Sequence, residues 1–447
     1  MKITPFLLFL ILGAFCLLSL PGWAQESASY NHFGGWTRLS AEPRMFFYTK
    51  QIDQTWWLID PGGKAFLSKG VNHISFTADF CPALGLSPYA LATQKKYGTE
   101  DAWAKAVAAN LRLWNFNTIG SWSGESMRRQ KMPYTYILDI GSSAGGDWEK
   151  GLFPDVYSKK FRQLAAHEAM IQCQSRKEDP YLIGYFSDNE LRWGADWRSP
   201  DSLLVSFLRL KPGEAGRQAA LDFLTRRYPS IDVLNQAWGT QVESFDQLPG
   251  SHPIPAGGAL KKDEDDFLEQ TAEIYFRVCM EEIRNQDSNH LILGCRFAGQ
   301  APAPVLRALR NHVDVVTFNT YQERPPEPAL REIYQITQKP ILITEFSFKA
   351  MDSGLPNTKG AGKPAPVQED RARLFTSFVS ELMELPFIIG YHWFEYTDEP
   401  AEGRFDGENS NYGLVNIQDE PWEVLTREMS KTNGQIESIH AGISSVP

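Results

Sequence analysis

The feature that most constrains the fold is a repeated alternation of short apolar segments with amphipathic stretches. Each apolar segment ends in polar or aromatic residues, and helical spacing follows several of them. Alternating strands and helices predict a parallel sheet covered by helices. Eight such units in a chain of 447 residues are typical of a (β/α)8 TIM barrel in the α/β class. The predicted strands are 65–74, 117–123, 134–140, 181–190, 290–297, 313–321, 340–346 and 387–396.

A doubly wound open sheet is the alternative arrangement for an α/β chain. That fold commonly carries a Gly-rich phosphate-binding loop after its first strand. No such loop follows any of the predicted strands, so the pattern favours the barrel.

The rest of the chain is organised around this predicted barrel, which spans 65–430. Residues 25–64 contain "TWWLIDPGG", with strand-like pieces around a Pro-Gly-Gly turn, and we expect a β-hairpin that closes the barrel floor. The connection between the fourth and fifth strands, about 191–289, is long enough for an elaborated excursion over the top face. Residues 431–447 are expected to form a C-terminal tail.

The first 24 residues have the pattern of a secretory signal peptide. Lys2 precedes a short apolar run, and the small residues Gly22 and Ala24 stand at −3 and −1 of a candidate cleavage site. An uncleaved membrane anchor is the alternative. The chain is therefore expected to be exported to the periplasm or the extracellular space, with no membrane association after cleavage.

The charge of the chain excludes some classes of partner. The formal net charge is −10, and loss of Lys2 with the signal peptide makes it −11. An acidic protein is a poor ligand for nucleic acid or anionic membrane surfaces. We therefore expect neither as a partner, and the oligomeric state is left open.

Neither a catalytic metal nor another cofactor is predicted. Histidines are few, and no H-E-x-x-H pattern occurs. A structural cation in the loops is left open.

Four cysteines follow the signal peptide, namely Cys81, Cys173, Cys279 and Cys295, with no C-x-x-C pair among them. Their spacing leaves both disulfides and buried free thiols possible.

Polar and aromatic residues gather at the carboxyl ends of the predicted strands, where TIM barrels carry their active sites. This composition is typical of a sugar site, because aromatic rings stack on the C–H faces of pyranoses while amides, Arg, His and carboxylates bind hydroxyl groups. The candidate residues are Asn72, His73, Trp122, Asn189, Glu190, Arg296, Asn319, Tyr321, Glu345, Trp393 and Glu395, with Glu408 in the following loop.

Two of these candidates, Glu190 and Glu345, form the predicted catalytic pair. Glycoside hydrolysis needs a proton donor for the leaving oxygen together with either a nucleophile or a base for water. Glu190 ends the fourth strand and Glu345 the seventh, and these strands lie nearly opposite each other in an eight-stranded barrel. In a retaining enzyme the two carboxyl groups would lie roughly 5–5.5 Å apart.

Several candidates also have a purely structural interpretation. His73 could be a hydrogen-bonded core histidine, Arg296 could pair with a neighbouring carboxylate, and Tyr321 could be a packing residue. Glu395 and Glu408 could belong to a solvated loop.

The motifs around these residues resemble known glycoside hydrolases. Asn189-Glu190 after the fourth strand, Glu345 in "ILITEF" and Trp393 in the eighth strand resemble clan A. The stretches "WWLIDPGGKAFLSKGVNHI", "GYFSDNELRWG", "LNQAWGT", "LGCRF" and "GYHWFEYTDEPAEGRFDGENSNYGLVN" are most similar to the family 50 β-agarases. The resemblance runs from about Gly35 to Trp422.

This resemblance implies a retaining hydrolase that cleaves β-galactosidic bonds in agarose-type galactans or their oligosaccharides. Glu190 would be the acid/base and Glu345 the nucleophile. Tyr321 would donate a hydrogen bond that keeps Glu345 ionised, and Asn189 would bind the 2-hydroxyl of the sugar.

Other functions remain open at the level of the sequence. Longer agarases of this type carry a large extra β-rich region before the barrel, whereas about 40 residues separate the predicted cleavage site from the first predicted strand. Action on oligosaccharides or from a chain end is therefore as consistent as endo action on the polymer. A β-galactosidase or another clan A exo-β-glycosidase is one alternative, and a non-catalytic carbohydrate-binding barrel is another.

Overall fold

The structure, a computed structural model, describes residues 29–249, 257–299 and 301–443. The predicted signal peptide lies outside these residues. Within them, no helix combines the length and the apolar character that a membrane span requires. The four cysteines Cys81, Cys173, Cys279 and Cys295 are buried free thiols.

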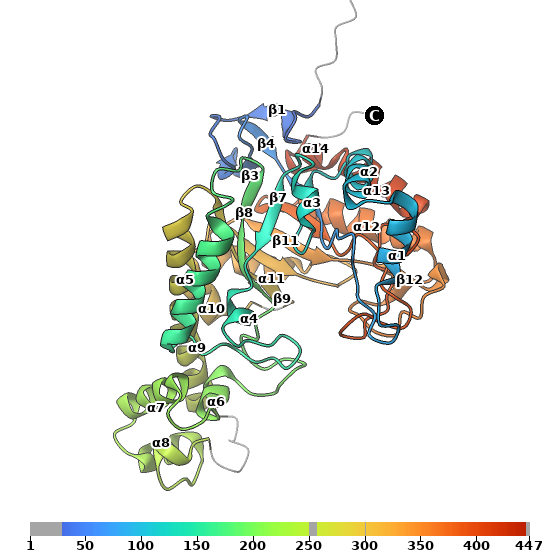
Figure 1. The fold of residues 1–447 in the computed structure, drawn as a ribbon. Coiled ribbons are helices and arrows are strands. Elements are labelled where there is room, and N and C mark those ends of the chain that lie inside the picture. The colour runs from blue at the N-terminus through green and yellow to red at the C-terminus, as the bar shows by residue number, and fades with distance from the viewer. Residues whose placement is uncertain (1–28, 250–256, 300, 444–447) are drawn as a thin grey trace, which may run out of the picture.

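Eight parallel strands form a closed barrel, which confirms the predicted TIM barrel (Figure 1). The strand order around the barrel is β10-β11-β14-β5-β6-β7-β8-β9, so neighbours in the chain are neighbours in space. Seven of these strands fall within a segment predicted from the sequence, and β9 extends one residue beyond the predicted segment 290–297. Their bounds are β5 Ser68–Val71, β6 Thr118–Ile119, β7 Tyr134–Ile137, β8 Leu182–Asn189, β9 Leu291–Ala298, β10 Val316–Asn319, β11 Ile341–Phe346 and β14 Ile388–Trp393.

Helices cover the outside of the barrel, and their apolar faces explain why. In α2, Trp103, Val107 and Leu111 recur at helical spacing and are fully buried. The hydroxyl group of Ser158 caps α5 by accepting a hydrogen bond from the Phe161 amide, as helix N-caps commonly do. The outer helices are α2 Glu100–Leu113, α5 Lys159–Cys173, α9 Gly258–Gln286, α10 Ala303–Leu309, α11 Glu327–Thr337, α12 Gln368–Met383 and α13 Glu423–Asn433.

A four-stranded antiparallel sheet precedes the barrel, where the sequence predicted a two-stranded hairpin. Its order is β1-β4-β3-β2, with β1 Trp36–Ser40, β2 Tyr48–Ile52, β3 Thr55–Ile59 and β4 Lys64–Phe66. The predicted first barrel strand, 65–74, is therefore divided. Its first residues pair with β1 and β3 of this sheet, and the barrel strand begins at Ser68.

This sheet lies at the amino-terminal end of the barrel, at the top of Figure 1. Phe33, Phe47, Leu58 and Phe66 form one buried apolar cluster with barrel residues. The barrel side of the cluster consists of Ile137, Ile183, Phe186, Leu291, Leu293, Val315, Leu342 and Ile389. The sheet thus covers the barrel floor with a dry apolar layer.

The connection from β8 to β9 is elaborated, as its length suggests. It contains α6 Leu203–Leu208, α7 Ala215–Arg227, α8 Ile231–Trp238 and η1 Phe245–Gln247 before α9. Figure 1 shows these helices beside the start of α9, at the end of the molecule remote from the N-terminal sheet. Among the described residues of this connection, those that line the barrel mouth are its first ones, up to Trp197.

The prediction of a C-terminal tail from residue 431 is wrong for the described residues. Helix α13 continues to Asn433, and α14 Ile436–His440 packs on the barrel. The reason is a buried ion pair, because Lys69 Nζ lies 2.7 Å from Glu437 Oε1 and also donates to the Asn433 carbonyl. The remaining short elements are α1 Pro88–Tyr97, α3 Glu125–Arg128, α4 Ile140–Ser143, β12 Lys349–Ala350, η2 Met351–Ser353 and β13 Pro364–Ala365.

Candidate active site

A cavity of about 750 Å³ lies at the carboxyl ends of the barrel strands. This is within the size range of sites that bind small molecules. Eight of the twelve predicted site residues line it: His73, Trp122, Asn189, Glu190, Asn319, Tyr321, Glu345 and Glu408. The structure therefore brings together most of the predicted site, although contact with a substrate remains a prediction for each residue.

Four residues that line the cavity have a left-handed backbone, which non-glycine residues rarely adopt. His73 and Trp122 have φ of 55° and 58°, and Asp139 and Glu190 have φ of 51° and 50°. They follow β5, β6, β7 and β8, so the same turn recurs at four consecutive strand ends. Such conformations cost roughly 1–3 kcal/mol each and are concentrated at functional sites.

Two hydrogen-bond donors hold Glu345, which is 5% exposed. The Tyr321 hydroxyl group donates to Oε2 at 2.8 Å, as the resemblance implied. Arg296 Nη2 lies 3.0 Å from Oε1, and the same nitrogen donates to the Thr344 carbonyl at 2.6 Å. Donation from both partners stabilises the carboxylate form, and one of them carries a full positive charge.

The pKa of Glu345 reflects a balance between burial and these partners. Burial raises it, the Arg296 charge lowers it, the Glu190 charge raises it and the Tyr321 hydrogen bond lowers it. The result is a pKa raised to about 7. Glu345 is thus poised to change its protonation state near neutral pH, and its ionisation depends on Arg296 and Tyr321.

Glu190 has a different set of partners. The indole N–H of Trp148 donates to Oε2 at 2.9 Å, and the Asn319 side-chain amide donates to Oε1 at 3.0 Å. The Asn319 amide also donates to Asn189 Oδ1 at 3.2 Å, which connects the two members of the Asn-Glu motif. Arg198 donates to the Glu190 carbonyl at 2.9 Å and so positions its backbone.

Asp188, the acid before this motif, does not line the cavity. Its carboxylate accepts from the Gly141 amide at 2.7 Å and from the Tyr275 hydroxyl, so it anchors the start of α4. Burial raises its pKa to about 8, against the hydrogen bond from Tyr275. Two acids, Asp188 and Glu190, lie at the carboxyl end of β8. Asp188 has a structural role, and Glu190 is the one that lines the cavity.

The prediction that Trp393 forms a sugar platform is wrong. Trp393 is fully buried, packs against Phe375 of α12 and donates its indole N–H to the Tyr412 carbonyl. The reason is strand alternation, because successive side chains point to opposite faces. Tyr391 and Trp393 face α12, whereas Phe394 lines the cavity.

Asn72 and Arg296 were predicted to bind substrate but lie behind the cavity wall. Asn72 donates to the carbonyls of Thr344 and Trp393 and accepts from the Ser121 amide, so it joins three barrel strands. Arg296 is fully buried, with its guanidinium carbon 4.4 Å from the Trp122 ring centroid. Its role in the structure is to hold Glu345 rather than to contact a ligand.

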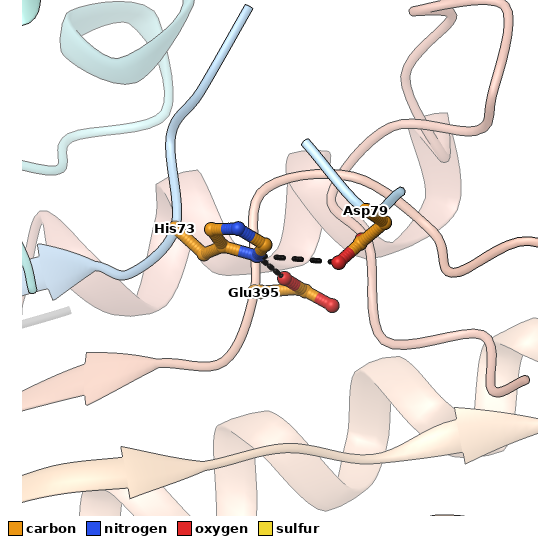
Figure 2. Close-up of side chains that lie close together, drawn as sticks. All are labelled: His73, Asp79 and Glu395. Carbon is orange, nitrogen blue, oxygen red and sulfur yellow. Dashed lines mark hydrogen bonds and ion pairs between the residues drawn. The ribbon is translucent and has the colours of Figure 1, made fainter. Parts of the chain in front are cut away.

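Glu395 was also predicted to contact substrate and is instead fully buried beside the cavity. It bonds His73 Nδ1, which lies 3.6 Å from Asp79 Oδ1 (Figure 2). Burial lowers the pKa of His73, but the charges of Asp79 and Glu395 outweigh it and raise that pKa to about 9. Glu395 therefore acts on the site through His73.

Several cavity residues were missed from the sequence, most of them in loops after strands. Trp148 follows β7, and Trp197 and Phe405 lie at the rim, 66% and 62% exposed. Exposed aromatics next to Gly, Asp or Arg in these loops were the available signal. Asp139 also lines the cavity, and burial raises its pKa to about 6. It follows β7 and lies within the predicted strand 134–140, whose end contributed no candidate.

Arg404 is the cavity residue with the most acidic surroundings. Its guanidinium lies 2.8 Å from Glu408 Oε2 and 2.9 Å from Asp406 Oδ2. The same group lies 3.4 Å from Glu399 and 3.7 Å from Glu395. The segment that follows β14 thus forms a charged network along one wall of the cavity. This segment belongs to the stretch that is most similar to the family 50 β-agarases.

No family model matches the chain. Sequence similarity nevertheless extends over most of it, to two proteins of Vibrio sp. (strain JT0107). β-Agarase B is 27% identical over 480 residues, which cover 90% of this chain and 50% of the relative. β-Agarase A is 29% identical over 454 residues, which cover 86% and 45%. The chain therefore spans about half the length of these relatives.

A crystal structure of an agarase has the same overall arrangement. It superposes with a TM-score of 0.79 at 28% identity, covering 93% of this chain and 68% of the agarase. The predicted resemblance to β-agarases is confirmed both in sequence and in fold: this chain is similar to β-agarases along nearly all of its described barrel.

Proposed function

We propose that this protein is an exported retaining glycoside hydrolase that cleaves β-galactosidic bonds in agarose-type galactans or their oligosaccharides. The observation that carries the proposal is the pair of glutamates in one cavity with different partners. Arg296 pairs with Glu345, whereas no described cation pairs with the Glu190 carboxylate. The similarity to β-agarases supports the choice of substrate.

In the first step Glu345 acts as the nucleophile. One carboxylate oxygen attacks the anomeric carbon while Glu190 donates its proton to the glycosidic oxygen, which leaves with the electron pair of the broken bond. Arg296 and Tyr321 keep Glu345 in the ionised form that this attack needs. The product of this step is a covalent glycosyl-enzyme and a free leaving-group sugar.

In the second step Glu190 acts as the base. It accepts a proton from a water molecule, and the water oxygen attacks the anomeric carbon and releases Glu345. Trp148 and Asn319 fix both carboxyl oxygens of Glu190 through this cycle. Two inversions at the anomeric carbon give net retention of the β configuration.

The walls of the cavity suit a chain of sugar rings. Trp122 and Phe394 flank the inner part, and Trp197 and Phe405 provide exposed aromatic surface at the rim. Aromatic rings can stack on the apolar faces of galactose units. The aromatic surface at the rim favours a substrate longer than a single sugar.

The test is a substrate panel of agarose, agaro-oligosaccharides, aryl β-galactoside and other aryl β-glycosides, with Glu345→Gln as the blank. We expect turnover of agaro-oligosaccharides and a β anomer as the first product detected by NMR. Turnover confined to simple β-glycosides would identify a different exo-glycosidase. No turnover of any substrate, together with saturable sugar binding, would indicate a binding barrel.

Export is tested separately by expressing the full chain in a Gram-negative host and sequencing the N-terminus of the released protein. Cleavage after Ala24 is expected, because Gly22 and Ala24 occupy the −3 and −1 positions. A protein that keeps Lys2 and stays with the membrane would contradict this part of the proposal.

A further inference from the structure

His73, Asp79 and Glu395 form a compact group of potential metal ligands (Figure 2). They come from the residues after β5, the loop before α1 and the residues after β14. One ligand atom from each residue lies within 4.8 Å of the other two. In Figure 2 the imidazole nitrogen and both carboxylates point toward one common space.

Asp79 is the member of this group that the rest of the described structure leaves unexplained. It is 5% exposed, yet neither of its carboxylate oxygens accepts a hydrogen bond from any described residue. Glu395 is fully buried, and its Oε1 likewise accepts no hydrogen bond from any described residue. Buried polar atoms without partners are rare in folded proteins, and a missing ion is one of the accepted explanations.

The positive charges nearby are too few to balance the acids. Arg404 is shared among four carboxyl groups, and its closest contacts are to Asp406 and Glu408. His73 is the described residue with an ion-pair contact to Asp79. Five acids, namely Asp79, Glu395, Glu399, Asp406 and Glu408, have ion-pair contacts with only two described cations, Arg404 and His73. The charge of Lys349 also acts on Glu399 and Glu408, so three cations face five acids.

We propose that His73 Nδ1, Asp79 and Glu395 bind one divalent cation of the transition series, of the Zn²⁺ or Mn²⁺ class. Imidazole nitrogen favours these ions over Mg²⁺ and Ca²⁺, which prefer oxygen ligands alone. A set of one imidazole and two carboxylates supplies three protein ligands and leaves further positions for water. Because a ligating nitrogen must be unprotonated, metal binding releases the proton between His73 and Glu395.

The geometry allows this with small movements. Zn–N distances of about 2.0–2.1 Å and Zn–O distances of about 2.0–2.2 Å limit two ligand atoms of one ion to about 4.3 Å apart. His73 Nδ1 and Asp79 Oδ1 already lie 3.6 Å apart. The contact between His73 and Glu395 must open to admit the ion.

The bound cation would join two loops of the cavity wall. His73 lines the cavity, whereas Asp79 and Glu395 lie behind it. The ion would therefore fix the imidazole and the segment that carries Arg404 and Glu408. This is a positioning role, and it is independent of the glycosidase proposal because its test measures metal binding.

The test uses the mature chain, stripped with a chelator and titrated with Mn²⁺ by electron paramagnetic resonance, with Zn²⁺ as competitor. We expect one Mn²⁺ per chain, displaced by Zn²⁺ and not by equimolar Mg²⁺. The melting temperature should rise with either bound ion, because ligands that bind only the folded state stabilise it.

Variants locate the ion. Asp79→Asn and Glu395→Gln should each weaken Mn²⁺ binding by about 100-fold or more, since loss of outer partners alone costs about 10–100-fold. Asp406→Asn is the matched control, because it removes an acid from the same network without removing a proposed ligand, and it should retain binding. Two ligand variants are used so that misfolding of one leaves the other informative.

Two results would overturn the proposal. Absence of saturable binding at one ion per chain, with no change in melting temperature, would show that His73 and the acids form an ion pair without metal. Equal weakening by Asp406→Asn and the ligand variants would show diffuse attraction to an acidic wall rather than a built site.

Discussion

The two ends of this barrel are built from the same strands by opposite rules. At the amino-terminal end, apolar residues of β7, β8, β9, β11 and β14 meet Phe33, Phe47 and Phe66 of the N-terminal segment. At the carboxyl end, the next residues of the same strands place Glu190 and Glu345 in a cavity of about 750 Å³. A few residues along each strand separate a dry core from a group of buried charges.

This difference shows where the protein tolerates energetic cost. Each of the consecutive strands β5 to β8 is followed, at its carboxyl end, by a non-glycine residue with a left-handed backbone, such as Trp122 or Glu190. Arg296 and Glu345 are buried together there, although removing two charges from water is expensive. The apolar packing at the amino-terminal end supplies stability. This stability allows the carboxyl end of the barrel to hold its functional groups in energetically costly positions.

The sharpest test of this comparison is Glu345→Gln, for which we expect the largest effect on activity. The amide keeps the size of the side chain but cannot attack the anomeric carbon. Turnover should fall on the order of 10⁴-fold or more on every substrate, as for loss of other catalytic nucleophiles. Steady-state rates on an aryl β-galactoside and on agaro-oligosaccharides measure it, with circular dichroism to show that the fold persists. A loss below 100-fold would remove Glu345 from the role of nucleophile.

Glu190→Gln should have a smaller effect that depends on the leaving group. General acid catalysis contributes about 10²–10⁴-fold, and an aryl leaving group needs little of it. Added azide should restore the rate of this variant and give a β-glycosyl azide, because azide attacks the glycosyl-enzyme without a base. NMR of the product distinguishes the roles. A β-azide from a Glu345→Gly variant and an α-azide from Glu190→Gly would show that the two roles are exchanged.

The floor should respond in the opposite way, with a change in stability rather than in chemistry. Phe66 is fully buried, and its ring centroid lies 5.1 Å from that of Phe47. Phe66→Ala should lower the free energy of unfolding by about 3–5 kcal/mol, the usual range for a buried Phe. Chemical denaturation measures this loss, and kcat at 20 °C should change less than twofold. A large loss of kcat without loss of stability would mean that the two ends are coupled.

The sequence predicted the barrel because its signal is distributed over the whole chain. Eight apolar segments with helices between them indicate one fold even when individual bounds are uncertain. The division of 65–74 between β4 and β5 could not be predicted in this way. A continuous apolar run does not show where one sheet ends and the next begins, because that depends on pairing with β1 and β3.

The candidate site was predictable where the residue type itself carries the chemistry. Glu190, Glu345 and Tyr321 line the cavity, as their places at the ends of predicted strands suggested. Asp188 and Glu395 show that an acid near a strand end can also be buried behind the cavity, bonded to other residues. Trp393 was misplaced because the choice between it and Phe394 rests on the alternation of a single strand. Trp148, Trp197 and Phe405 lie on loops, whose path over the cavity depends on tertiary packing and not on a local pattern.

The smallest expected effect is a shift of the pH profile on Tyr321→Phe. Glu345 must be ionised to attack, and its pKa is raised to about 7, so kcat/KM should rise with pH through about 7. The Tyr321 hydrogen bond lowers that pKa, and its removal must raise it. A hydrogen bond of about 0.5–1.5 kcal/mol corresponds to a shift on the order of one pH unit.

The acid limb of kcat/KM should therefore move to higher pH, with activity lost at pH 6 and largely recovered at pH 8.5. Tyr412→Phe is the matched control, because the Tyr412 ring centroid lies 6.0 Å from that of Tyr321 while its hydroxyl group bonds the Ala361 carbonyl. Its limb should stay in place. An acid limb that stays fixed in Tyr321→Phe, or moves to lower pH, would show that the phenol does not stabilise the Glu345 carboxylate. The cavity would then depend on the charges of Arg296 and Arg404 to keep Glu345 ionised.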